Sequence, residues 1–211
     1  VTDEENYYIP RYDVDALIIE VELILDWYAP HIARSGLSSG ARATFINLWK
    51  PLLEKVCAAR STWTLRDYHS PNLIWLPERD GLQRVGIIDF QDCVQGHPSY
   101  DLVSLLQDAR VDVPDELELK LLGQYTRQRR QDTPDFDVTE FARSYAIMGA
   151  QRATKILGIF ARLDRRDAKP QYLAHLPRVE RYLAKDLAHP DLALLRAWYA
   201  EYLPRAIASH A

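Results

Sequence analysis

The 211-residue sequence is poor in cysteine and has no long hydrophobic run. Two cysteines, Cys57 and Cys93, are too few for a disulfide framework and suit a reducing compartment, so we expect a cytoplasmic protein. The apolar stretch at residues 16–25 is interrupted by Glu20 and Glu22, so no segment is predicted to span a bilayer.

Neither sign of charge dominates the sequence. Twenty-six basic and thirty acidic side chains leave a net charge of −4, which gives no electrostatic reason to expect binding to nucleic acid or an anionic membrane. The apolar content of 47% excludes a disordered chain, and a chain of this length can bury about 70% of its unfolded surface. We therefore expect one large folded domain.

Methionine is almost absent as well. The chain begins at Val1, and its single methionine is Met148. Because an open reading frame does not begin with valine, we expect residues 1–211 to be a segment of a longer protein.

Helical periodicity dominates the sequence. Residues 13–29 carry apolar side chains on one helical face and end before Pro30, and Ser38 or Ser39 could cap a second helix that runs to about Arg60. Further helices are predicted near residues 99–109, 115–131, 137–164, 171–187 and 190–202.

Three short segments have strand character instead, at residues 62–66, 73–76 and 84–88. The last two flank a turn-forming stretch at residues 77–81 and predict a small β-hairpin. The expected fold is α+β and mostly α, with one small β element buried between helices and functional loops beside it.

Those loops contain the most specific motifs. The first reads LRDYHSPN over residues 65–72, with Asp67 five positions before Asn72; the second reads GIIDFQD over residues 86–92, with Asp89 before Phe90. A third segment, GHPSYDL over residues 96–102, places Asp101 at the start of a predicted helix.

Together the three motifs resemble those of the aminoglycoside phosphotransferase-like small-molecule kinases, which share the protein-kinase fold. More narrowly, they are similar to bacterial amino-sugar kinases that phosphorylate the anomeric hydroxyl of N-acetylmuramate and N-acetylglucosamine in cell-wall recycling. Two positions depart from the common pattern: many relatives have histidine where this chain has Leu65, and aspartate where it has His97. Neither position carries the transfer chemistry.

The resemblance implies a role for each of four polar residues in the motifs. Phosphoryl transfer requires a proton acceptor for the attacking hydroxyl and metal ions that neutralise the phosphate oxygens. Asp67 would accept the proton, Asn72 and Asp89 would bind Mg²⁺, and Asp101 would support the catalytic loop structurally. ATP and Mg²⁺ are the implied cofactors.

The glycine-rich phosphate loop and the strand lysine of such kinases are missing from the chain. In the family both belong to an N-terminal nucleotide lobe. We therefore expect residues 1–211 to be a kinase-like C-terminal lobe, catalytic and acceptor-binding, that is inactive alone.

Candidates for acceptor binding come from two predicted helices and from the catalytic loop. Glu22 and Asp26 share an acidic stripe that either lines the acceptor pocket or forms an ordinary outer face. Arg152 lies in the apolar stripe of residues 137–164 and either pairs with Glu22 or Asp26 or anchors a substrate. His69, within the catalytic loop, is a further candidate.

Two alternative functions remain at this stage. An aminoglycoside or other small-molecule phosphotransferase would share the motifs, although a polycationic acceptor favours a densely acidic pocket and the net charge here is only mildly negative. A non-catalytic binding module with a kinase fold is disfavoured by the presence of Asp67, Asn72 and Asp89 together.

Overall fold

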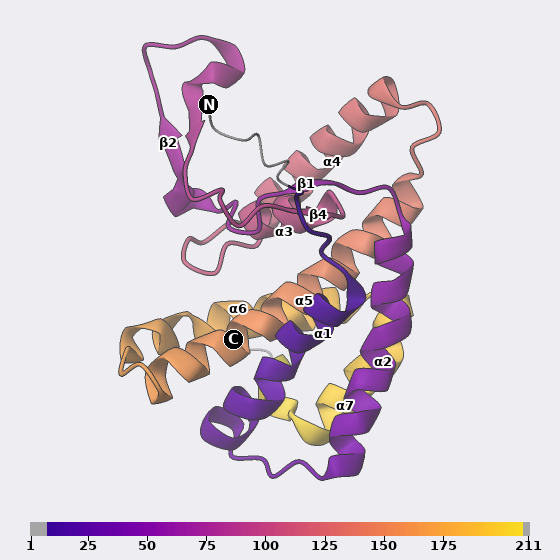
Figure 1. The fold of residues 1–211 in the computed structure, drawn as a ribbon, viewed down its shortest axis with the longest axis vertical. Helices are drawn as coiled ribbons and strands as arrows, with labels where there is room; N and C mark the ends of the chain where they lie inside the picture. The colour runs from indigo at the N-terminus through magenta and orange to yellow at the C-terminus, as the bar shows by residue number, and fades with distance from the viewer. Residues whose placement is uncertain (1–7, 209–211) are drawn as a thin grey trace, which may run out of the picture.

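The computed structural model describes residues 8–208, which form a mostly helical fold with two small sheets (Figure 1). The α-helices are α1 (Val14–Leu23), α2 (Ser39–Ala58), α3 (Ser99–Leu106), α4 (Asp115–Asp132), α5 (Val138–Arg165), α6 (Leu176–Asp186) and α7 (Ala193–Tyr202). The strands are β1 (Thr62–Thr64), β2 (Leu73–Trp75), β3 (Val85–Ile87) and β4 (Val94–Gly96). The mostly α character predicted from periodicity is confirmed.

Helix α5 is the central element of the core. It packs against α1, α3 and α6, and in Figure 1 it runs through the middle of the molecule. Asp137 caps its first turn by accepting hydrogen bonds from the backbone N–H groups of Thr139 at 2.8 Å and Glu140 at 3.0 Å. Most side chains of α5 between residues 141 and 161 are buried, because the other helices pack around it.

The first predicted helix does not end at Pro30. After Leu23 the backbone continues as a π-helix, Ile24–Ala33, with Pro30 inside it. Proline has no N–H to donate to an α-helical hydrogen bond, and its ring clashes with a carbonyl group of the preceding turn. The wider π-helical turn relieves that clash. The helix ends instead at Arg34, whose backbone is left-handed with a φ of 54°.

The hairpin predicted from residues 73–76 and 84–88 is confirmed: β2 and β3 pair antiparallel, with Leu73 opposite Ile87 and Trp75 opposite Val85. The second sheet is not predicted in full. Strand β1 pairs antiparallel with β4, a segment that the sequence did not mark as a strand.

The hairpin is not buried between helices, and that expectation was wrong. It projects from the helical body, with Ile74 44% exposed and Trp75 63% exposed (Figure 1). The guanidinium of Arg84 covers one face of the Trp75 ring at 5.7 Å. The apolar composition of the strands therefore does not reflect contact with the core.

Several other boundaries differ in detail. The first strand stops at Thr64, α3 ends at Leu106, and the two C-terminal helices begin as 3-10 turns, Pro170–His175 and Pro190–Leu192. Proline is favoured in such first turns because its missing N–H has no partner there anyway. Within residues 8–208, no helix combines the length and apolar character needed to cross a bilayer.

Gly158 allows the closest approach of α5 to α1. A Cβ at this position would lie 2.4 Å from the backbone carbonyl carbon of Leu23, which cannot move without shifting the helix. We expect Gly158→Ala to lower the free energy of unfolding by about 2–3 kcal/mol, measured by urea denaturation.

Gly123→Ala is the matched control, because Gly123 also lies within a helix but has only the flexible Arg127 guanidinium nearby, at 3.5 Å. There the higher helix propensity of alanine should raise stability by about 0.5–1 kcal/mol. Equal stability of the two variants would contradict this account of the α1–α5 contact.

Candidate active site

The loop that carries Asp67 is held by Asp101, in the first turn of α3. The two carboxylate oxygens of Asp101 accept hydrogen bonds from the backbone N–H groups of Leu65 at 2.7 Å and Arg66 at 3.0 Å. Asp101 thus fixes the two residues immediately before Asp67, and Asp67 itself is exposed. Burial raises the pKa of Asp101, although the two backbone hydrogen bonds and the charge of Arg152 act in the opposite direction.

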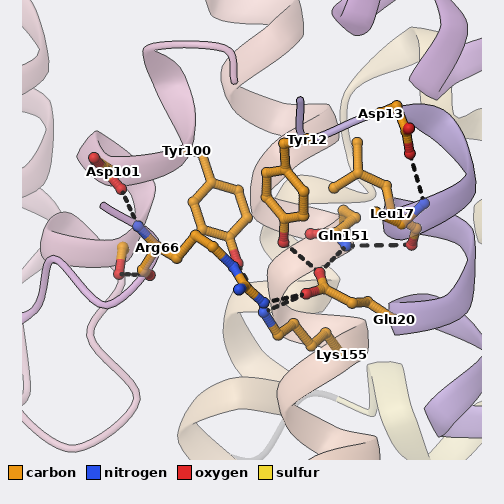
Figure 2. A network of polar contacts seen from close by, with 11 residues as sticks. Tyr12, Asp13, Leu17, Glu20, Arg66, Tyr100, Asp101, Gln151 and Lys155 are labelled. Carbon is orange, nitrogen blue, oxygen red and sulfur yellow. Dashed lines mark hydrogen bonds and ion pairs between the residues drawn. The ribbon is translucent and has the colours of Figure 1, made fainter. Parts of the chain in front are cut away.

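Arg66 is in a strained backbone conformation. Its φ is 66°, in the left-handed region that non-glycine residues seldom adopt. The side chain compensates by reaching α1, where its Nη2 donates to Glu20 Oε1 at 3.0 Å, and its guanidinium lies 5.4 Å from the centre of the Tyr12 ring. Arg66 is therefore held at its backbone by Asp101 and at its side chain by Glu20 (Figure 2).

Glu20 is the acceptor at the centre of this network. Besides Arg66 it accepts hydrogen bonds from Lys155 Nζ at 2.8 Å, Gln151 Nε2 at 3.0 Å and the Tyr12 hydroxyl (Figure 2). Burial alone would raise the pKa of Glu20, but the positive charge of Lys155 and the donated hydrogen bonds outweigh burial and keep it below its ordinary value. Glu20 is therefore ionised and joins the catalytic loop to α1 and α5.

Asn72 and Asp89 lie side by side on adjoining loops. The Asn72 Nδ2 donates to the Asp67 carbonyl oxygen at 2.9 Å and to Asp89 Oδ2 at 3.3 Å, and the Ile88 N–H donates to the Asn72 carbonyl oxygen at 3.1 Å. Asp89 has a φ of 60°, which directs its side chain back toward the Asp67 loop. With Nδ2 engaged in this way, the amide oxygen of Asn72 is left for another ligand.

One carboxylate and one amide oxygen suit Mg²⁺, which takes few protein ligands and completes its octahedron with water and phosphate oxygens. Within residues 8–208 no group of three or more histidine, cysteine, aspartate or glutamate side chains could hold a metal ion. The donor set of Asn72 and Asp89 thus fits a metal shared with a nucleotide better than a metal enclosed by protein.

His69 lies beneath the catalytic loop. Its side chain is 7% exposed, and its Nε2 is 3.4 Å from a guanidinium nitrogen of Arg110. Burial lowers its pKa, and the positive charges of Arg110 and Arg152 lower it further, so the ring is neutral at pH 7. We predicted His69 as an acceptor ligand, and in the structure its ring is buried beside Arg110 rather than open to solvent.

Asp108 gives a second support to the same loop. Its two carboxylate oxygens accept hydrogen bonds from the backbone N–H groups of Ser70 at 2.9 Å and Arg110 at 2.8 Å. Asp101 and Asp108 thus hold opposite ends of the segment that contains Asp67.

A pocket opens beside Asp67, and most of its polar lining is basic. The side chains around it are Arg66, Asp67, Tyr100, Arg110, Arg152, Lys155, Ile156, Ile159 and Phe160. Four of these are cations and one is a carboxylate. The pocket is therefore suited to an anion near the Asp67 carboxylate.

Of the three predicted acceptor residues on helices, only Arg152 lines this pocket. Asp26 is exposed on the π-helix and pairs with Arg42, while Glu22 lies in α1 outside the lining of the pocket. Arg152 makes no ion pair within the described residues, so its predicted pairing with Glu22 or Asp26 is wrong. Asp26 therefore faces solvent, and Glu22, which is half-buried, stays outside this pocket.

Sequence reasoning missed Glu20, Lys155, Arg110 and Asp108. A signal for Glu20 was present: its neighbours three positions before and four positions after, Leu17 and Ile24, are both buried, so Glu20 borders the core face of α1. No comparable pattern marks Lys155 or Arg110, which reach the pocket only because α5 and the segment after α3 pack together.

These geometric features define a loop that presents a carboxylate next to an amide and a second carboxylate. The model of the phosphotransferase enzyme family matches residues 12–141, which is more than half of the chain, and the chain belongs to this family.

The sequence is also similar to curated proteins named N-acetylmuramate/N-acetylglucosamine kinase. One from Caulobacter vibrioides is 41% identical over 202 residues, which cover 96% of this chain and 54% of the relative. One from Pseudomonas putida is 33% identical over 92% of this chain and 56% of the relative. One from Neisseria meningitidis is 34% identical over 92% of this chain and 57% of the relative. The chain thus spans about half the length of the curated relatives it matches.

Replacing Glu20 tests the network that holds the catalytic loop. Glu20→Gln keeps the shape of the side chain but leaves Arg66 and Lys155 without their shared anion in a mostly buried environment. We expect the free energy of unfolding to fall by about 2–4 kcal/mol, measured by urea denaturation. Glu54→Gln, on the exposed side of α2, is the control and should change stability by no more than about 0.5 kcal/mol. A variant at Glu20 as stable as the control would show that the network does not stabilise the loop.

Proposed function

We propose that this chain is the catalytic and acceptor-binding lobe of an ATP- and Mg²⁺-dependent kinase that phosphorylates an amino-sugar hydroxyl. The acceptor we propose is the anomeric hydroxyl of N-acetylmuramate or N-acetylglucosamine, as the names of the relatives and the resemblance of the motifs indicate. The observation that carries the proposal is the position of Asp67, on a pocket wall, one hydrogen bond from Asn72, which in turn contacts Asp89.

The proposed role of Asp67 is to accept the proton of the attacking hydroxyl. Its carboxylate borders the pocket, and its backbone is fixed by the hydrogen bonds that Asp101 and Asn72 make around it. A carboxylate on a backbone fixed in this way can orient the acceptor oxygen before transfer, and orientation is a large part of catalysis in phosphoryl transfer.

Asn72 and Asp89 are the residues proposed to hold Mg²⁺, through the amide oxygen and the carboxylate. When bound, the ion would neutralise charge on the phosphate oxygens of the nucleotide. The hydrogen bond between Asn72 and Asp89 keeps the two ligands adjacent, and Gln91 Nε2, which donates to Asp89 Oδ1 at 2.6 Å, limits rotation of the carboxylate.

An aminoglycoside acceptor is less compatible with the pocket. Aminoglycosides are polycations, and the side chains beside Asp67 include Arg66, Arg110, Arg152 and Lys155. Like charges brought together in a partly desolvated pocket repel one another. A neutral or acidic sugar fits this lining better.

An acceptor screen tests the proposed function. ATP consumption by the complete gene product should be stimulated by N-acetylmuramate and N-acetylglucosamine and not by an aminoglycoside such as kanamycin. Stimulation by the aminoglycoside alone would replace the proposal with antibiotic phosphorylation. The absence of turnover with every acceptor would favour the non-catalytic binding module.

Asp67 and Asp89 should have separable effects in the same protein. Asp67→Asn should lower kcat by about 10²–10⁴, the usual contribution of a positioned proton acceptor, with little change in nucleotide affinity. Asp89→Asn should weaken Mg²⁺-dependent nucleotide binding, measured with a fluorescent ATP analogue, as well as lower kcat. Asp80→Asn, in the exposed turn of the hairpin, is the control and should change neither property. Identical kinetic and binding profiles for the variants at Asp67 and Asp89 would contradict the separate roles.

A further inference from the structure

Arg152 is a buried cation without a counter-ion. Its side chain is 6% exposed, its Nε has no hydrogen-bond partner, and no carboxylate within residues 8–208 lies at ion-pair distance. The nearby carboxylate of Asp101 is already engaged by two backbone N–H groups. A guanidinium removed from water without a partner is costly, so the site is incomplete as it stands.

Two of the other three cations around the pocket have a counter-ion. Arg66 and Lys155 both contact Glu20, at 3.0 and 2.8 Å. Arg110, which is exposed, has a guanidinium nitrogen 3.4 Å from the ring of the neutral His69, and its side chain forms no ion pair within residues 8–208. Arg152 and Arg110 are therefore the two cations of the pocket that have no carboxylate of the described residues at ion-pair distance.

We propose that Arg152, assisted by Arg110, is the subsite that binds the carboxylate of an acidic sugar acceptor and distinguishes that acceptor from a neutral sugar. The inference rests on the proposed function and names a residue that determines its specificity. Arginine suits this task because its planar guanidinium can bind a carboxylate through two parallel hydrogen bonds.

The remaining lining of the pocket agrees with this ligand. N-acetylmuramate differs from N-acetylglucosamine by a lactyl ether, which carries a carboxylate next to a methyl group. Ile156, Ile159 and Phe160 provide an apolar wall beside Arg152 that can contact such a methyl group. Asp67 lines the same pocket, whose cavity holds only about 80 Å³. We therefore expect the lactyl group to enter the pocket toward Arg152, while the sugar ring lies over its opening with the hydroxyl toward Asp67.

An arginine in this pocket can bind either of two anions, the carboxylate of the acceptor or the phosphoryl group in transfer. Kinetics on an acidic and a neutral sugar distinguishes these two roles. In the complete gene product, Arg152→Met should lower kcat/KM for N-acetylmuramate by about ten- to a hundredfold and for N-acetylglucosamine by less than about threefold. Equal losses on the two sugars would overturn the proposal, because they would assign Arg152 to the phosphoryl group or to the fold. Arg165→Met, on the exposed end of α5, is the matched control and should leave both values within about twofold of the unchanged protein.

Equilibrium binding tests the subsite without any turnover, so its failure can be distinguished from failure of the proposed kinase activity. Isothermal titration should show tighter binding of N-acetylmuramate than of its uncharged carboxamide, and Arg152→Met should abolish the difference. The melting temperature of Arg152→Met should not fall, because Arg152 forms no ion pair within residues 8–208 and its removal relieves the burial of a charge. Equal affinity of the unchanged protein for the acid and the amide, or a large drop in melting temperature, would refute the assignment.

Discussion

Arg66 holds the catalytic loop in place, and the geometry of the site depends on it. Its left-handed backbone conformation is sterically costly. That conformation is stabilised because Asp101 accepts a hydrogen bond from the backbone N–H of Arg66 and Glu20 accepts one from its guanidinium. Since Asp101 lies in the first turn of α3 and Glu20 lies on α1, one residue joins two helices that are distant in sequence. The position of Asp67 follows directly, because it is the next residue along the chain.

The local motifs could be identified from the sequence because their residues stand at fixed positions within short segments. Asp67, Asn72 and Asp89 were selected because these motifs resemble those of small-molecule kinases, and the structure brings Asn72 into contact with the other two. The residues that complete the pocket were not predictable, because Lys155 reaches Glu20 only after α5 has packed on α1. A single sequence without a three-dimensional frame contains no spacing that relates those two positions.

The errors in the predicted fold also have physical causes. Pro30 interrupts an α-helix but is accommodated by a π-helical turn, and periodicity alone does not separate these two outcomes. The apolar side chains Ile74 and Trp75 favoured a buried hairpin, yet strand propensity reflects the pleated backbone as well as burial. In both cases the composition of the segment was compatible with more than one environment, and the surrounding helices decided which was realised.

The net charge of the chain is a poor guide to its pocket. At physiological ionic strength, exposed charges more than about 8 Å apart are largely screened, so the overall excess of acidic residues has little effect on a bound ligand. The cations that line the pocket act at much shorter range and in a partly desolvated space, where each charge counts for more. Two of them, Arg66 and Lys155, share the single negative charge of Glu20, which also fixes the loop, while Arg152 forms no ion pair within residues 8–208. The same carboxylate that positions Asp67 therefore also determines which cations remain available to a ligand, and this couples the geometry of the proposed catalytic base to the charge that the acceptor meets.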